Sequence, residues 1–192
     1  GINGVAWDAV ELPSQFLFYF AWEKPVLDQI SCNYQTGKSL PDSLIKKMRN
    51  AKNFQAGLQL LRQLELSLFD FRLHLEFDPK KDYTQIQALL DKIRKRINII
   101  PVSPFNRFQH GFSHIFAGGY AAGYYSYLWA EVLSCDAFTK FLEDGIFNQE
   151  TGQAFLQSIL EQGGAIDAME LFKKFRGREP KIQAFLKSLD IE

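Results

Sequence analysis

Apolar residues recur along most of this chain at steps of three and four, the pattern of helices that bury one face. The clearest example lies between Phe54 and Leu75, where the apolar positions that keep this step are Leu58, Leu61, Leu64, Leu68 and Phe69. No stretch alternates convincingly between apolar and polar residues, as a half-buried strand does. The pattern therefore predicts an all-α fold.

Capping and helix-breaking residues divide this pattern into separate helices. Asp8 is expected to cap a long helix that runs to about Ile30 and is kinked by Pro13 in its first turns. Asn53 is expected to cap the helix at 54–75, and Asn148 or Thr151 a later one through about 162. The remaining helices are expected at 41–51, 83–97, 121–138 with an end by residue 145, 168–175 after an Asp167 cap, and 181–189.

The composition limits the partners of the chain. Its 192 residues contain 22 Lys plus Arg and 22 Asp plus Glu, so no net charge attracts nucleic acid or an anionic membrane. A hydrophobic content of 46% with 15% aromatic residues is enough for a substantial core. The uncharged run Ile115–Ala130 is shorter than a bilayer span. We therefore expect neither nucleic acid nor a membrane among the partners, and a solvated face for the basic run Lys92–Arg96.

The two cysteines and the first residues bear on location and completeness. Cys32 and Cys135 form neither a CxxC pair nor a spaced framework, which suits a reducing, cytoplasmic location. The chain opens with Gly1-Ile2-Asn3-Gly4, without Met or a charged and then apolar targeting segment. This opening is interpreted as the start of a C-terminal fragment of a larger protein.

The richest chemistry lies between Phe112 and Phe138. Gly118-Gly119 favours a loop that lets backbone approach another group closely, and a helix is expected to follow. On that helix Tyr120, Tyr124 and Tyr127 would share one face at i, i+4 and i+7. Such a face is either a buried aromatic stripe or, with His114 beside it, a set of hydroxyl donors aimed at a ligand oxygen.

Other polar residues allow similar alternatives. Glu11 heads a mostly apolar helical face, so its carboxylate needs either a salt bridge or a bound cation. His74 is expected to be a cation at a helix end or a solvated residue. His110 and His114 have a spacing that would suit a zinc pair only on an uninterrupted helix, which the glycines oppose. The charged turn at 176–180 is expected to be structural, as an interhelical clamp or an exposed corner.

Three stretches, in this order, make the chain resemble a known family. They are Trp7-Asp-Ala-Val-Glu-Leu-Pro-Ser-Gln15, the run HIFAGGYAAGYYSYLWAEVLS from His114, and Phe175-Arg-Gly-Arg-Glu-Pro180. Together they are similar to the thimet oligopeptidase family of zinc metallopeptidases and cover almost the whole chain. The resemblance implies that residues 1–192 are one continuous C-terminal part of a mainly helical catalytic domain. The HExxH motif, which supplies two zinc ligands and the general base in that family, does not occur in these residues.

The resemblance also implies roles for single residues. Glu11 would be the third protein ligand of a catalytic Zn2+. Tyr120 and Tyr127 would stabilise the oxyanion, while His114, Gly118, Gly119 and Tyr124 would contact the substrate. The parent protein would be a cytosolic endopeptidase that hydrolyses short peptides, such as fragments from protein turnover and signal peptides, with zinc-activated water.

Two features leave this function open. The chain alone, without the upstream half as its partner, is expected to be inactive, and it is alternatively a non-catalytic helical remnant or interaction fragment. Phe18 and Tyr19 stand where the family usually has Glu-Asn. This change either removes a polar group that supports a ligand or reflects a repacked core.

Overall fold

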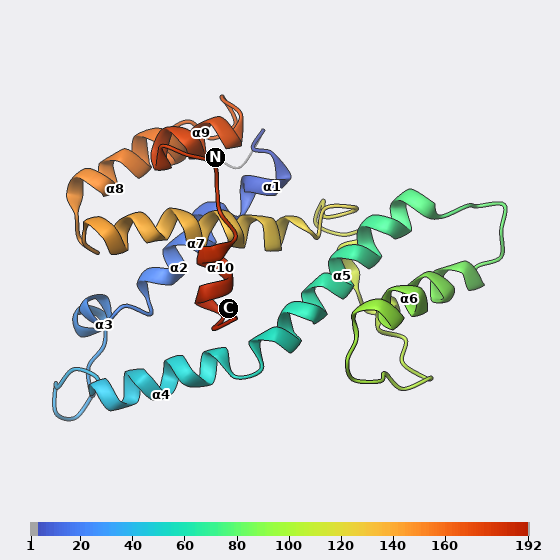
Figure 1. Ribbon diagram of the computed structural model, residues 1–192, viewed down its shortest axis with the longest axis horizontal. Coiled ribbons are helices and arrows are strands. Elements are labelled where there is room, and N and C mark those ends of the chain that lie inside the picture. Colours follow the sequence, from blue (N-terminus) through green and yellow to red (C-terminus); the bar gives the residue numbers. More distant parts are fainter. Residues whose placement is uncertain (1–3, 192) are drawn as a thin grey trace. The chain divides into compact units, whose positions relative to one another are not determined.

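The computed structural model of the chain describes residues 4–191, and its regular elements in that range are all helices (Figure 1). No strand occurs among those residues. The predicted all-α fold is confirmed. It follows from the three- and four-residue apolar step that recurs along the chain.

The chain forms two compact units. Unit 1 runs to Ala56 and resumes at Trp129, and unit 2 comprises Gly57–Leu128. The elements of unit 1 are α1 (Trp7–Val10), α2 (Leu12–Phe20), α3 (Lys24–Ile30), α4 (Asp42–Asn53), α7 (Ser126–Asp144) from Trp129 onward, α8 (Gln149–Phe155), the π-helix η3 (Leu156–Leu160), α9 (Ala168–Arg176) and α10 (Gln183–Ser188). Those of unit 2 are α5 (Ala56–Glu76) after its first residue, α6 (Thr84–Ile97) and the 3-10 turns η1 (Phe108–His110) and η2 (Ser113–Ile115). That residues 1–192 are one continuous part of a catalytic domain stays a prediction.

The expected long helix from Asp8 to Ile30 was wrong, because the chain breaks it into α1, α2 and α3. Asp8 lies inside α1, whose N-cap is Ala6. Pro13 stands in the first turn of α2 and Pro25 in the first turn of α3. Each proline lacks a backbone donor and clashes with the carbonyl four residues earlier, so each starts a new helix instead of kinking an old one.

The helix expected from Ala121 begins only at Ser126. Ala122 adopts a positive φ of 58°, which a helix cannot continue. Tyr120 and Tyr124 therefore precede α7, and only Tyr127 lies in it. The prediction that the three tyrosines share one helical face was wrong, although the predicted end of this helix by Gly145 is confirmed.

The ends of α4, α8 and α9 test the capping residues that the sequence predicted. Asn148 caps α8 by accepting the Thr151 N–H, and Asp167 caps α9 by accepting the Met169 N–H, as predicted. Asn53 ends α4 instead of capping α5. Its expected role was wrong because Gln55, at a φ of 56°, separates the two helices.

The core of unit 1 is aromatic. The Phe16 ring, 2% exposed, stacks on Phe155 with ring centroids 4.0 Å apart and packs against Phe138 and Phe141. These rings join α2 to α7 and α8. Offset and edge-on pairs of this kind add to the free energy of apolar burial.

A buried carboxylate ties the turn at 176–180 to α7. Asp136, fully buried, accepts hydrogen bonds from the Arg178 guanidinium at 2.5 and 2.6 Å and from the Lys181 amide at 2.6 Å. Burial alone would raise the pKa of Asp136, but these donors and the Arg176 charge outweigh it and hold the pKa below its usual range. Arg176 also pairs with Glu143 at 2.8 Å. The predicted interhelical clamp is confirmed.

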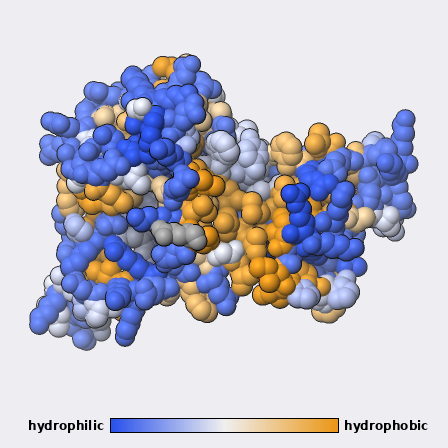
Figure 2. Space-filling model, in the orientation of Figure 1, coloured by the Kyte–Doolittle hydropathy of each residue, from blue (hydrophilic) through white to orange (hydrophobic). Residues whose placement is uncertain are grey.

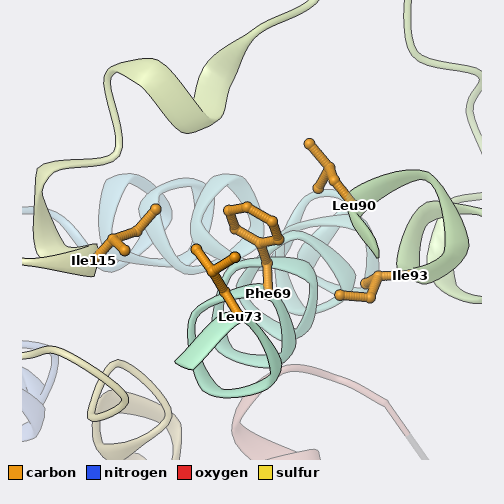
Figure 3. Close-up of a cluster of buried hydrophobic side chains, with 5 residues drawn as sticks. All are labelled: Phe69, Leu73, Leu90, Ile93 and Ile115. Carbon is orange, nitrogen blue, oxygen red and sulfur yellow. The ribbon is translucent and has the colours of Figure 1, made fainter. Parts of the chain in front are cut away.

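The core of unit 2 joins α5, α6 and the turn η2. Figure 3 shows its five buried side chains gathered around Phe69, and they are Phe69, Leu73, Leu90, Ile93 and Ile115. Ile115 belongs to the segment that carries His114, so this core anchors one end of the candidate site to α5. Burial of a large apolar side chain such as Ile115 favours that attachment by about 2 kcal/mol.

A second anchor in unit 2 is ionic. Glu65, 1% exposed, binds Arg94 at 2.8 Å and Arg62 at 3.0 Å. Both guanidinium groups lie over the Phe108 ring, at 5.2 and 4.4 Å from its centroid, and Arg94 also donates to Asn106 at 2.7 Å. The segment that leads into the candidate site is thereby held against α5 and α6.

The expected packing side of α5 was partly wrong. Leu64 and Leu68 are each 36% exposed, whereas Phe69 and the carboxylates of Glu65 and Asp70 are buried. These carboxylates can be buried because both find hydrogen-bond donors.

The molecular surface shown in Figure 2 is mostly hydrophilic, with hydrophobic patches visible on it. Within residues 4–191, no helix has the combined length and apolar character that crossing a bilayer requires.

Candidate active site

His114 stands at the centre of a cluster of tyrosine rings in unit 2. Its imidazole lies 5.3 Å from the ring of Tyr120, 5.3 Å from that of Tyr124 and 6.1 Å from that of Tyr127, centroid to centroid. All three contacts are edge-on, and all four side chains are partly exposed. The structure therefore brings together the four side chains that the sequence singled out, in a partly exposed position that is not a buried core stripe.

The tyrosines also contact one another. The rings of Tyr120 and Tyr127 stack at 5.0 Å with 14° between their planes, and Tyr124 meets Tyr127 edge-on at 5.2 Å. The turn that precedes α7 produces this arrangement, since it brings the Tyr120 ring against the ring of Tyr127 in the first turn of the helix. Such a cluster can present hydroxyl and imidazole groups to one ligand.

Gly118 and Gly119 lie in the exposed loop before these rings. Both adopt positive φ, 72° and 81°, the left-handed region that side chains disfavour. A Cβ at Gly118 would also lie 3.2 Å from Cδ2 of Tyr120. Both glycines are thus needed for the turn, Gly118 is also needed for the close approach of Tyr120, and the predicted Gly-rich loop is confirmed.

The Tyr124 hydroxyl has a partner within the unit. It donates to Oε1 of Gln63 at 3.0 Å. Burial, and then the neighbouring Tyr127, raise the pKa of Tyr124, so its phenol stays protonated at neutral pH. Tyr124 can therefore donate one hydrogen bond, and a ligand would compete with Gln63 for it.

Asp70 is a residue that sequence reasoning missed. Its fully buried carboxylate on α5 accepts the backbone N–H groups of Ala122 at 3.1 Å and Tyr124 at 3.0 Å. One turn later, His74 lies 3.3 Å from the same carboxylate and meets the ring of Phe116. In the sequence, the only signal for this contact was an aspartate four residues before a histidine. Of the two, only His74 was considered, as a helix-end cation or a solvated residue.

Glu11 lies in unit 1, where α1 ends and α2 begins, with φ and ψ of −88° and −4°. Its side chain is half-buried, and the Ser14 hydroxyl lies 3.0 Å from the Glu11 carbonyl oxygen and 3.3 Å from Oε2. The expectation that it heads a mostly apolar face of one long helix was wrong, because the helix breaks on both sides of α2.

Glu11 fits a zinc site as one donor of a larger set. A glutamate carboxylate is a normal zinc ligand. Among the described residues, no group of three or more His, Cys, Asp or Glu side chains could hold a metal ion. His110 and His114 lie in separate 3-10 turns, η1 and η2, so the uninterrupted helix that a zinc pair would need is not formed.

The aromatic pair Phe18-Tyr19 takes two different environments. Phe18 is 52% exposed, whereas Tyr19 is 7% exposed and its hydroxyl donates to the carboxylate of Glu131 and contacts Sγ of Cys135 at 2.7 Å. Burial raises the pKa values of Tyr19 and Glu131, and that of Cys135 to about 11. Tyr19 thus belongs to the core of unit 1, which favours the repacked-core alternative at that position.

Comparison with known proteins assigns the chain to a family. The model of peptidase family M3 matches residues 1–191, so the chain belongs to that family. It is 57% identical over 192 residues to oligopeptidase A of Escherichia coli K12 and 56% identical to oligopeptidase A of Salmonella typhimurium LT2. Against saccharolysin of Saccharomyces cerevisiae the identity is 37% over 194 residues. The resemblance to the thimet oligopeptidase family is confirmed.

These alignments cover only part of each relative. All of this chain is aligned, but it corresponds to 28% of either bacterial oligopeptidase A and to 27% of saccharolysin. The chain therefore spans less than a third of the length of the relatives it matches, and no activity of the whole protein follows from the alignment alone.

Proposed function

We propose that this chain is the C-terminal part of a zinc-dependent oligopeptidase that hydrolyses short peptides. Membership of peptidase family M3 and the names of the bacterial relatives support the reaction class. The upstream part of the same protein would supply the HExxH motif, as the partner of this segment. The free cysteines Cys32 and Cys135 suit the cytoplasm as its location.

The observation that carries the proposal is the His114 cluster, because it offers several polar groups around one exposed loop. In the proposed reaction Tyr120 and Tyr127 donate hydrogen bonds to the oxygen that becomes negative when a peptide carbonyl is attacked. Their rings are already stacked, with centroids 5.0 Å apart, before substrate arrives. Donors held in this way stabilise a developing charge without reorganising.

The remaining residues of the cluster would bind the peptide. Gly118 and Gly119 are exposed and carry no side chain, so a substrate backbone can lie directly along them. His114 and Tyr124 would contact the same peptide, with the Tyr124 hydroxyl exchanging Gln63 for a substrate acceptor. These contacts would select short, flexible peptides that can adapt to the loop, including fragments from protein turnover and cleaved signal peptides.

Glu11 would be the third protein ligand of one Zn2+ ion. The Ser14 hydroxyl, 3.0 Å from the Glu11 carbonyl oxygen and 3.3 Å from Oε2, would turn to Oε2 and orient the carboxylate for coordination. When bound, zinc supplies a Lewis acid that polarises a carbonyl and makes water a stronger nucleophile at neutral pH. This role requires the two further ligands of the upstream part.

Peptide hydrolysis by the full-length protein tests the proposal. A quenched fluorescent peptide of about ten residues should be cleaved, the rate should fall on treatment with a zinc chelator, and added Zn2+ should restore it. A folded, full-length protein that cleaves no short peptide with or without Zn2+ would contradict the proposal. It would favour the alternative of a non-catalytic helical remnant or interaction fragment.

A further inference from the structure

Asp70 connects a rigid helix to the loop that carries the candidate site. We propose that Asp70 is a positioning residue that fixes the glycine–tyrosine loop, residues 116–124, in the conformation required for the proposed peptidase activity. The proposal rests on that activity for its consequence, but the geometry of the contact stands independently. Asp70 is not among the residues proposed to contact the oxyanion or the peptide.

The contact uses both oxygens of the carboxylate. Oδ1 accepts the N–H of Ala122 at 3.1 Å, and Oδ2 accepts the N–H of Tyr124 at 3.0 Å. Hydrogen bonds from backbone amides to a charged carboxylate are about twice as strong as those between neutral groups. The two bonds therefore pin the loop at two points two residues apart.

The pinned segment includes a strained residue. Ala122 has a φ of 58°, which costs an alanine about 1 kcal/mol or more relative to ordinary backbone. A left-handed residue with a side chain persists only where its surroundings fix it. The hydrogen bonds to Asp70 lie on Ala122 itself and two residues after it, so they fix this turn directly.

The turn sets the direction of the aromatic side chains. Tyr120 lies two residues before Ala122 and Tyr124 two residues after it, and both meet His114 edge-on at 5.3 Å. If the turn relaxed, these two rings would separate while Tyr127, which is in α7, stayed in place. Asp70 thus governs the geometry between Tyr120 and its stacking partner.

The position of Asp70 suits this role. It is fully buried on α5, next to Phe69 of the unit 2 core, so the carboxylate itself is held rigidly. His74, one turn further on α5, contacts both Asp70 and Phe116, the first residue of the loop. Two residues on one helix face therefore hold the two ends of the loop.

Amide hydrogen exchange in the full-length protein tests the contact directly. The amides of Ala122 and Tyr124 should exchange at least about tenfold more slowly in the wild type than in Asp70→Asn, because the amide side chain turns an NH2 group toward one of the two donors. Asp78→Asn is the matched control. Asp78 also accepts a loop amide in unit 2, from Lys80 at 3.0 Å, and its substitution should leave both exchange rates unchanged.

Kinetics then separate positioning from simple support of the fold. At a temperature where Asp70→Asn is folded, kcat/KM should fall by about 10- to 100-fold, mainly through kcat, because donors are misplaced by roughly 1 Å. Ala122→Gly in the same background should restore about fivefold, since glycine adopts the left-handed turn without strain. A purely structural role predicts a lower Tm with kcat retained and no rescue by glycine.

Clear outcomes overturn the proposal. Slow amide exchange at Ala122 and Tyr124 in folded Asp70→Asn would contradict the role proposed for Asp70. Wild-type kinetics in that variant would contradict it as well. If Asp70→Asn does not fold, amide exchange in the wild type tests the proposal. Fast exchange at Ala122 and Tyr124 would then contradict hydrogen bonding of these amides to Asp70. If the wild type cleaves no peptide, the proposed function fails, whereas the exchange measurement still decides whether Asp70 fixes the loop.

Discussion

The phenol rings of Tyr120 and Tyr127 lie nearly parallel, with their centroids 5.0 Å apart. Seven residues on a continuous helix rise by about 10.5 Å, so a helical arrangement would have separated these rings along its axis. The turn at Ala122 brings them together instead. Two rings that the sequence places seven residues apart thereby become stacked neighbours, and the proposed function has their hydroxyls donate to one oxygen atom.

Removing one hydroxyl tests the catalytic role of this pair. In the full-length protein, Tyr127→Phe should lower kcat by about 10² to 10³, with KM and stability nearly unchanged, because the ring and its stacking survive. A tyrosine that only supports the fold would instead cost about 0.5–1.5 kcal/mol of stability with kcat retained. Steady-state kinetics and the Tm of the same preparation distinguish the two.

Tyr120→Phe provides the companion measurement. If Tyr120 and Tyr127 donate to the same oxygen, the double variant should lose less activity than the product of the two single losses. Fully multiplicative losses would indicate that the two hydroxyls act independently. Wild-type turnover in both single variants, with a lowered Tm, would show that the two hydroxyls support the fold and take no part in catalysis.

Gly118→Ala should destabilise the protein by about 1–2 kcal/mol, because alanine disfavours a φ of 72°. The new Cβ would also press on the Tyr120 ring at 3.2 Å, so kcat should fall as well. Gly152→Ala is the control, since Gly152 lies in α8 with nothing within 4 Å of an added Cβ. It should stabilise the helix by roughly 0.5–1 kcal/mol. Equal free energies of unfolding for Gly118→Ala and wild type in urea would contradict the need for glycine.

The buried Asp136 predicts a pH dependence of stability. Its pKa is lower in the folded chain than the ordinary value of 3.8, so its contribution is complete at pH values above 3.8 and is lost as the pH falls through the lower, folded pKa. Asp136→Asn should cost about 3 kcal/mol at pH 7, the low end for a broken buried pair because Arg178 is 33% exposed.

Urea denaturation at pH 7 and pH 3 measures this difference. The cost of Asp136→Asn should shrink at the lower pH, because the Asp136 carboxylate of the unfolded chain binds a proton there and the unfolded state is thereby favoured. The exposed Glu179, paired with Lys173, is the control, and Glu179→Gln should change stability little at either pH. A cost for Asp136→Asn that is the same at both pH values would contradict the clamp.

The apolar pattern predicted most helices, because residues at 83–97 and the caps Asn148 and Asp167 carry their signals locally. It failed where a distant group decides the backbone. Pro25 is a local signal for the start of a new helix, and the prediction of one helix to Ile30 did not use it. Nothing local indicates that Ala122 leaves the helical region, since its stabilising partner Asp70 lies 52 residues earlier.

The candidate site shows the same division. Residue types near Gly118-Gly119 indicated that His114 and the tyrosines converge, and the structure brings them together. The stacking of Tyr120 on Tyr127 and the bond from Tyr124 to Gln63 depend on the turn and on α5. Such contacts between distant segments are set by tertiary packing, which local periodicity does not encode.

The 192-residue chain by itself should bind little zinc and cleave no peptide. Glu11 alone cannot replace three protein ligands, and the described residues contain no cluster of three or more candidate ligands. Elemental analysis after dialysis, alongside a peptidase assay, measures both properties. Equimolar zinc with chelator-sensitive cleavage in this chain would reveal a complete site that the account lacks.

The zinc content of full-length Glu11→Gln tests the central claim most directly. The full-length wild type should retain about one Zn2+ per molecule after dialysis, because three protein ligands then complete a catalytic site. The Glu11→Gln protein should retain far less and lose chelator-sensitive peptidase activity, while Glu23→Gln, which changes the carboxylate that pairs with Arg49 in the same unit, should retain its zinc. Stoichiometric zinc and full activity in Glu11→Gln would contradict the assignment of this chain to the metal site of an oligopeptidase.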